Sequence, residues 1–252
     1  MAGTDARDRE NLREISDALA QLGYSDAGDS ILAALHSPGD NPLSVIRLAL
    51  QETASAKAEA VYKSKFGRSK LDAPVFLSDL YTYKVRQLDL EYIQQLSELT
   101  FVRDRMNLII WGSPGTGKTW MAKALATKAC QKGYSTRWVT YPFLCRELMR
   151  LRTEDSKRYE ARLKYNSKFQ VLCIDEFPNA EIEDKFIMQE FFNIRALSGN
   201  STIVSGQCEP RNWDALFEVK SFAQSIRGRL LEHAHQLEMK GPDLRLYDPN
   251  RE

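Results

Sequence analysis

One short motif has the residue types and the spacing of a phosphate-binding loop. The stretch "WGSPGTGKTW" contains two glycines separated by four residues and followed by lysine and threonine: Gly112, Gly117, Lys118 and Thr119. Glycines allow backbone N–H groups to surround a phosphate, lysine supplies positive charge, and the threonine hydroxyl helps to hold Mg²⁺. The motif therefore predicts that the chain binds a nucleotide.

The expected nucleotide contacts extend over the whole loop and one residue beyond it. The residues predicted to bind the nucleotide are Gly112, Ser113, Pro114, Gly115, Thr116, Gly117, Lys118, Thr119 and Trp120. Lys118 is also expected to act in catalysis by contacting the β and γ phosphates, and Thr119 is expected to bind Mg²⁺. ATP and Mg²⁺ are the predicted cofactors.

Two acidic residues end an apolar run downstream of the loop. The run "VLCIDEF" contains Asp175 and Glu176, as expected of a buried strand that reaches the carboxyl edge of a sheet, where ligands bind. Asp175 is predicted to hold Mg²⁺, and Glu176 to polarise the attacking water as the catalytic base. Because a small-molecule kinase needs no water-activating base, the pair favours hydrolysis over kinase chemistry, which stays an alternative.

Two further polar side chains are candidates for the same reaction. Gln207 ends the apolar run "STIVSGQ" and is expected to contact the γ-phosphate or to position the water. Arg229, and less well Arg227, lies late in the chain and suits the phosphate charge of a neighbouring copy. A polar residue at a strand end and a surface arginine on a helix are the plainer interpretations, and both stay open.

Two basic clusters are candidates for contact with nucleic acid. They lie in the stretches "CRELMRLRTEDSKRYEARLKY" and "YKSKFGRSK". Lys and Arg contacts with phosphates supply most of the sequence-independent affinity for DNA. The predicted DNA-binding residues are Arg146, Arg150, Arg152, Lys157, Arg158, Arg162, Lys63, Lys65, Arg68 and Lys70. For both clusters, a solvated helical face of mixed charge is the alternative.

The elements that must position these residues follow from the apolar pattern. From about residue 100, short apolar runs alternate with helical patterns, at 107–112, 135–141, 169–177, 201–207 and 235–241. Strands that alternate with helices predict a parallel sheet covered on both faces. We therefore expect an α/β fold, with a P-loop core built on a five-stranded parallel sheet between helices. Leu144, Leu148 and Leu151 predict the buried stripe of one helix in the basic segment.

The first third of the chain reads as helical, and the segment after it is basic and contains Gly and Pro. The predicted organisation is a helical N-terminal module over 1–65, a linker over 66–78 and an ATPase domain over 79–252. Too few residues follow Arg229 for an additional helical lid. No full C-terminal lid domain is therefore expected. Arg245, which follows Arg229 in the chain, is not assigned a contact with the phosphates of the nucleotide.

Composition narrows the classes of function. The 35 Lys and Arg nearly cancel the 34 Asp and Glu, so nucleic-acid binding must come from local patches. No stretch approaches the roughly 20 apolar residues that span a bilayer, and the polar N-terminus does not resemble a signal peptide. We expect no membrane association and a cytoplasmic location. Four dispersed cysteines predict reduced thiols rather than a metal site: Cys130, Cys145, Cys173 and Cys208.

The order of the motifs resembles that of AAA+ ATPases: loop, acid pair, polar strand end and late arginine. Within that superfamily, "STIVSGQCEPRNWDALF" and "SIRGRLLEHAHQLEMKG" are similar to IstB-like helper ATPases of bacterial insertion sequences, relatives of the DnaC and DnaI helicase loaders. The resemblance covers nearly the whole chain, most strongly residues 73–245. It implies that Gln207 takes the sensor-1 position, where asparagine is more usual, and that Arg229 takes the arginine-finger position.

The resemblance implies a bacterial cytoplasmic ATPase that self-assembles on double-stranded DNA. Its partners would be further copies of itself, in an ATP-dependent ring or helical homo-oligomer, and the transposase of the same element, which it recruits or stimulates. The alternative is a replicative helicase loader of the DnaC/DnaI type, which would bind a helicase ring and prefer single-stranded DNA. A zinc-bearing N-terminal adaptor is not expected, because no cysteine precedes Cys130.

Overall fold

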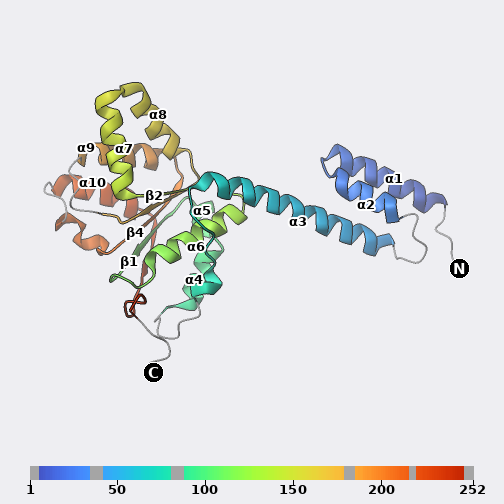
Figure 1. Ribbon diagram of the computed structural model, residues 1–252, viewed down its shortest axis with the longest axis horizontal. Helices are drawn as coiled ribbons and strands as arrows, with labels where there is room; N and C mark the ends of the chain where they lie inside the picture. The colour runs from blue at the N-terminus through green and yellow to red at the C-terminus, as the bar shows by residue number, and fades with distance from the viewer. Residues whose placement is uncertain (1–5, 35–41, 81–87, 179–184, 216–219, 247–252) are drawn as a thin grey trace. The chain divides into compact units, whose positions relative to one another are not determined.

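The computed structural model describes the main part of the chain, namely residues 6–34, 42–80, 88–178, 185–215 and 220–246. The chain divides into two compact units, residues 1–61 and 62–252, and most of their elements are labelled in Figure 1. Across these described ranges, no helix combines the length and the apolar character needed to cross a bilayer.

The first unit is helical. Its elements are α1 (Ala6–Gln21), α2 (Ser25–Ala34) and the first part of α3 (Pro42–Ser69). A Cβ atom on Gly28 would lie 2.7 Å from Oγ of Ser16, so the missing side chain is what allows α1 and α2 to approach closely. Leu12, Ile31 and Ala49 form the small apolar core of this unit.

Helix α3 extends beyond the point where the sequence predicts a linker. It runs to Ser69, through Gly67, whose Cβ position faces open space. A glycine there costs about 1 kcal/mol relative to alanine, but Phe66 packs against the core of the second unit and holds this turn in place. The helix ends where Lys70 adopts a φ of 66°. The domain boundaries expected from the sequence stay a prediction, because compactness alone does not test independent folding.

The second unit contains the predicted five-stranded parallel sheet. Its strands are β1 (Asn107–Trp111), β2 (Thr136–Thr140), β3 (Val171–Asp175), β4 (Ser201–Gly206) and β5 (Ala234–Glu238). They lie in the order β2-β3-β4-β1-β5, and every neighbouring pair is parallel. The five apolar runs of the sequence are therefore confirmed as strands, and the α/β fold class is confirmed with them.

Helices cover both faces of the sheet (Figure 1). Leu108 and Ile110 of β1 point to one apolar cluster, with α4, α5 and α6, whereas Ile109 points to the other, with α7, α8, α9 and α10. The bounds of the covering elements are η1 (Leu77–Leu80), α4 (Leu90–Ser97), α5 (Thr100–Arg103), α6 (Lys118–Gln131), α7 (Tyr141–Glu154), α8 (Ser156–Ser167), α9 (Lys185–Leu197), η2 (Pro210–Ala215) and α10 (Lys220–Leu231). This double cover explains why the strands read as nearly continuous apolar runs.

The basic segment forms two helices, α7 and α8. The predicted stripe is confirmed, since Leu144, Leu148 and Leu151 are all buried on α7. The helix then breaks at Asp155, whose backbone is extended with φ −158° and ψ 101°. Its carboxylate accepts a hydrogen bond from the backbone N–H of Arg158 at 3.0 Å, which makes Asp155 the N-cap of α8.

A buried arginine fastens helix α9 to the sheet. Arg195 is 2% exposed; its Nε donates to Thr202 Oγ1 at 3.2 Å, and one Nη1 bond reaches the carbonyl oxygen of Ser167 at 2.9 Å. Further bonds from its guanidinium reach the carbonyls of Phe169 and Ser201. Burial lowers the pKa of Arg195 to about 9, which still leaves the side chain charged at neutral pH.

Replacing Arg195 with methionine is expected to lower the free energy of unfolding by roughly 2–4 kcal/mol, because several buried acceptors lose their donor. Chemical denaturation measures this loss. Arg211→Met is the matched control, because the Arg211 side chain is 77% exposed, and its effect should stay within about 0.5 kcal/mol. Equal stability of the two variants would contradict the fastening role.

Candidate nucleotide site

The phosphate-binding loop connects β1 to α6. Gly112 follows β1 with a φ of 149°, and a Cβ atom on it would lie 2.2 Å from the carbonyl oxygen of Met239. The two segments are this close because the N–H of Met239 donates to the carbonyl oxygen of Trp111 at 2.7 Å. Backbone packing alone thus requires a glycine at the first position of the loop.

Lys118 lies within the loop rather than in solvent. The residue is 9% exposed, and its Nζ donates to the carbonyl oxygen of Ser113 at 2.6 Å. The hydroxyl of Thr116 donates to the same oxygen at 2.9 Å. Burial lowers the pKa of Lys118, and the nearby charge of Asp175 opposes this shift. The ammonium is therefore held at the centre of the loop, where a P-loop binds phosphate.

Asp175 joins three elements of the site. It ends β3, and its Oδ2 accepts a hydrogen bond from the hydroxyl of Thr119, in the first turn of α6, at 2.9 Å. Its Oδ1 accepts from the hydroxyl of Ser205 in β4. The pairing of Ile174 with Val204 brings Asp175 beside Ser205. Ser205 was missed by sequence reasoning, because only the adjacency of β3 and β4 reveals its role.

The oxygens at this point fit a magnesium ion. Mg²⁺ prefers oxygen ligands and usually takes one or two from the protein, with the rest from phosphates and water. The Thr119 hydroxyl and the Asp175 carboxylate lie in direct contact and match that donor set. No cluster of three or more His, Cys, Asp or Glu side chains suited to a metal occurs in the described part of the chain, where all four cysteines are free thiols.

Glu176 lies just outside the buried end of β3. Its backbone turns sharply, with a φ of 60°, and the N–H of the next residue, Phe177, donates to the carbonyl oxygen of Ser205 at 2.9 Å. Asp175 is consequently buried, whereas Glu176 is exposed. The two adjacent acids thus occupy different environments, one fixed by hydroxyl groups and one directed to solvent.

Gln207 is exposed at the same edge of the sheet. It follows Gly206, which pairs with Trp111, the last residue of β1. The register therefore places Gln207 level with Gly112, the first residue of the loop. A Cβ atom on Gly206 would lie 1.5 Å from the carbonyl oxygen of Phe177, so this glycine is what allows the chain after β3 to cross the end of β4.

A C-terminal strap, defined as residues 239–246, runs along the loop and was not foreseen from the sequence. The N–H of Leu244 donates to the carbonyl oxygen of Gly115 at 3.0 Å. Gly115 has a φ of 74°, and a Cβ atom on it would lie 1.8 Å from Oδ1 of Asp243. Arg245 pairs with that carboxylate at 2.7 Å. Both charges of the pair also influence the pKa of Lys118, in opposite directions.

Of the two arginine candidates, Arg229 lies at the opposite edge of the sheet from the loop. Asn107 begins β1, and its Nδ2 donates to the carbonyl oxygen of Arg229 at 3.3 Å. The guanidinium of Arg229 donates to the carbonyl and hydroxyl oxygens of Ser225 at 2.9 and 2.7 Å. Arg227 pairs with Asp214 at 3.4 Å. Because β1 spans about 13 Å, the backbone of Arg229 lies at the far end of that strand from its own loop.

The remaining predicted residues are distributed over four helices, α3, α6, α7 and α8, and the residue that follows α3. Trp120 is 53% exposed on α6. Among the DNA-binding candidates, α7 carries Arg146, Arg150 and Arg152, α8 carries Lys157, Arg158 and Arg162, and the end of α3 carries Lys63, Lys65 and Arg68, with Lys70 just beyond. Arg150 pairs with Glu154 at 2.8 Å and Arg162 with Glu147 at 2.9 Å, so part of this charge is compensated within the helices.

The second unit has an α/β P-loop fold of the AAA+ type, with a five-stranded parallel sheet, a phosphate loop after β1 and an acid at the end of β3. Residues 42–251 match the family described as IstB-like ATP binding protein. The chain belongs to this family.

Two relatives of the chain are named as ATP-binding proteins of insertion sequences. The insertion sequence ATP-binding protein y4uH of Sinorhizobium fredii is 26% identical over 234 residues, which cover 90% of this chain and 92% of the relative. The insertion-sequence ATP-binding protein Rv3427c of Mycobacterium tuberculosis is 24% identical over 236 residues, which cover 93% of each. Each match extends over nearly the full length of this chain and of the relative.

Solved structures share the fold. The crystal structure of DnaI has a TM-score of 0.54 and 22% identity, with 67% of this chain and 89% of that chain covered. The DnaC helicase loader has a TM-score of 0.53 and 19% identity, with coverage of 71% and 99%. The resemblance to the DnaC and DnaI clade is therefore confirmed at the level of fold.

Replacing Lys118 with alanine is expected to weaken ATP binding by roughly 10- to 100-fold, because a hydrogen bond to a charged group contributes about 1.5–3 kcal/mol. Titration calorimetry measures the affinity. Lys123→Ala is the control on the same helix, because Lys123 is bonded instead to Asp72 at 2.7 Å. Wild-type affinity in the Lys118 variant would show that the loop lysine does not contact phosphate.

Proposed function

We propose that the chain is an ATP-hydrolysing, DNA-binding helper of transposition that serves the transposase of its insertion sequence. The observation that carries hydrolysis is the acid pair at the end of β3, with Asp175 bonded to Thr119 of the phosphate loop. Membership of the IstB-like family and relatives named as insertion-sequence ATP-binding proteins support the role in transposition.

In this proposal the chain's own residues divide the work of hydrolysis. Lys118 binds the β and γ phosphates, and Thr119 and Asp175 hold Mg²⁺, which would neutralise phosphate charge when bound. Glu176, exposed beside the site, accepts a proton from the attacking water. Gln207, level with the start of the loop, contacts the γ-phosphate or the water through its amide.

The position of Arg229 favours a site completed by two copies. Its main chain is bonded to the first residue of β1, whereas the phosphate loop follows the last residue of that strand. An arginine finger at this place acts on the nucleotide of a neighbouring copy, through a head-to-tail interface that builds a ring or a helical row. ATP then lies at the interface and holds the copies together.

The basic residues of α7, α8 and the end of α3 are proposed to contact the phosphates of double-stranded DNA. A helicase loader remains the second candidate, because DnaI and DnaC share the fold. The insertion-sequence helper is preferred, since the relatives that match nearly the whole chain are named as insertion-sequence proteins.

Mixing two inactive variants tests the shared site. Arg229→Ala should bind ATP without hydrolysing it, and Lys118→Ala should bind ATP too weakly to hydrolyse it at the ATP concentration used. Each variant supplies what the other lacks, so an equal mixture is expected to regain about a quarter of the wild-type rate if copies join head to tail at random. Phosphate release measures the rate. A fully active Arg229 variant, or no recovery on mixing, would contradict a finger that acts between copies.

Duplex DNA is expected to raise the ATP turnover of the wild-type chain several-fold. The Glu176→Gln variant should bind ATP, hydrolyse it slowly and stay bound to the DNA. Turnover assays with duplex, single-stranded and no DNA measure the effect, and a strand-transfer assay with a transposase of the same insertion sequence tests the proposed partner. A preference for single-stranded DNA, with capture of a helicase and no transposase stimulation, would favour the loader instead.

A further inference from the structure

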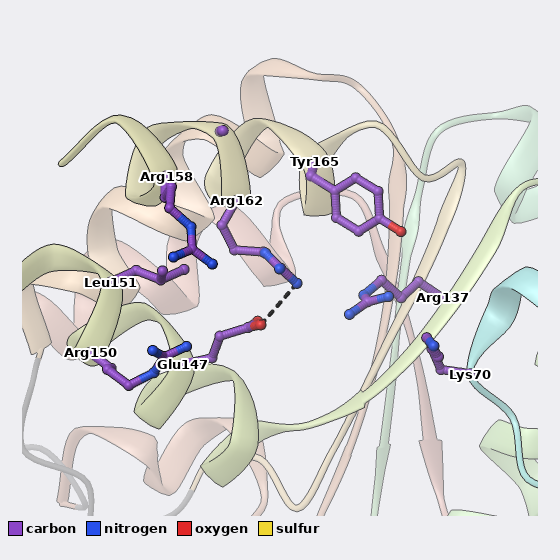
Figure 2. Close-up of a pocket in the computed structure, with 9 residues that line it drawn as sticks. Lys70, Arg137, Glu147, Arg150, Leu151, Arg158, Arg162 and Tyr165 are labelled. Atoms are coloured by element: carbon purple, nitrogen blue, oxygen red, sulfur yellow. Dashed lines mark ion pairs between the residues drawn. The ribbon is translucent and has the colours of Figure 1, made fainter. Parts of the chain in front are cut away.

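A basic pocket lies between the α7–α8 hairpin, strand β2 and the residue that follows α3. It encloses about 550 Å³, and five of the side chains that line it are cationic: Lys70, Arg137, Arg150, Arg158 and Arg162. Figure 2 shows Arg137 and Arg162 pointing toward each other across this space. The pocket thus brings together residues of both predicted DNA-binding clusters, and it adds Arg137, which neither cluster includes.

Arg137 is the unusual member of this group. The residue is 6% exposed, and its guanidinium carbon lies 5.2 Å from the ring centre of Tyr165 and 5.8 Å from that of Phe169. Its Nε–H has no hydrogen-bond acceptor in the structure. A buried guanidinium with an unpaired N–H is costly, and because this guanidinium lines the pocket (Figure 2), an anion bound there would offset part of that cost.

The charges around the pocket are only partly balanced. Arg162 pairs with Glu147, which is also in the lining, at 2.9 Å, and Arg150 pairs with Glu154 at 2.8 Å. Lys70, Arg137 and Arg158 have no carboxylate partner within the described part of the chain. The lining thus has one carboxylate against five cations. Arg137 and Arg158, the two arginines without a carboxylate partner, present planar N–H donors that match phosphate oxygens.

The lining indicates which part of a nucleic acid the pocket recognises. Tyr165 is the only aromatic residue among the lining side chains of this pocket, and Arg137 and Arg162 already lie over its ring, at 5.2 and 5.6 Å. The side chains therefore offer charge and N–H donors rather than a vacant ring for a base. Recognition of this kind reads phosphate and is independent of base sequence.

We propose that this pocket binds backbone phosphate of the DNA, with Arg137 as its buried anchor, and that it fixes the register of the duplex against the α7–α8 hairpin. The inference rests on the proposed DNA binding and deepens it. It is separate from the nucleotide site, because Arg137 is the second residue of β2, whereas the neighbouring β3 ends at Asp175 beside the last residue of β2.

The first test measures affinity for duplex DNA against salt concentration. Arg137→Met should lower the affinity roughly 10-fold and reduce the salt slope by about 1. Arg137→Lys should recover part of both, since it restores a cation but not the planar donors. Glu147→Gln should bind DNA more tightly than the wild type, because it removes the one lining carboxylate. The matched control is Arg103→Met, whose side chain is 71% exposed on α5; it should match the wild type.

The second test needs no DNA. Inorganic pyrophosphate is titrated into the full chain while the Nε–H resonances of arginine are followed by NMR, with that of Arg137 assigned from its absence in Arg137→Lys. The Arg137 resonance should shift on titration, and Glu147→Gln should shift it at lower pyrophosphate concentrations. Thermal unfolding confirms that each variant is folded, and Arg137→Lys replaces Arg137→Met if the methionine variant does not fold.

The two tests separate the possible failures. If the wild type does not bind DNA, the proposed function fails, and the pyrophosphate titration still decides whether the pocket takes phosphate. If DNA binds with the same affinity and salt slope in Arg137→Met as in the control, the pocket inference is overturned while the proposed function stands. A pyrophosphate shift without any effect on DNA overturns the DNA assignment and identifies the pocket as a site for a small phosphorylated molecule.

Discussion

The nucleotide site depends on the hydrogen bonds that the carboxylate of Asp175 accepts. This carboxylate accepts hydrogen bonds from the hydroxyl groups of Thr119, 56 positions away in the chain, and Ser205, 30 positions away. These bonds connect β3 to the first turn of α6 and to β4. A carboxylate that is 7% exposed needs such partners. The strand order, the glycine at the end of β4 and the turn at Glu176 are all arranged around this contact, which orients the same oxygens that a magnesium ion prefers.

Much of the fold follows from the sequence, because parallel strands covered on both faces leave continuous apolar runs such as "NLIIW" and "VLCID". The phosphate loop is also evident from sequence, since its glycines are required by local backbone geometry. Ser205, Asp243 and Arg137 were not predictable in this way. Their roles arise from strand adjacency, from the path of the C-terminal strap and from packing against α8, and none of these leaves a periodic signal. The break at Asp155 was missed for a related reason, as one capping residue interrupts an otherwise helical pattern.

The sheet separates three kinds of chemistry. Its carboxyl edge carries the phosphate loop, the acids and Gln207, and its amino edge carries Arg229 beside the start of β1. The outer strand β2 carries Arg137 and the basic pocket. In the proposed function, the nucleotide, the neighbouring copy and the DNA phosphates would therefore contact different parts of the same sheet. The proposed stimulation of ATP turnover by DNA would act through these shared strands.

The separation of Arg229 from its own phosphate loop has a geometric consequence. One end of β1 leads into the loop and the other lies against an arginine, so copies that meet through these two surfaces all face the same way. A row of them has a front and a back, whereas a featureless duplex looks the same from either end. In the proposed function, such a row on DNA would give the duplex a direction that it lacks by itself, and an enzyme recruited to one end of the row would act on one side only.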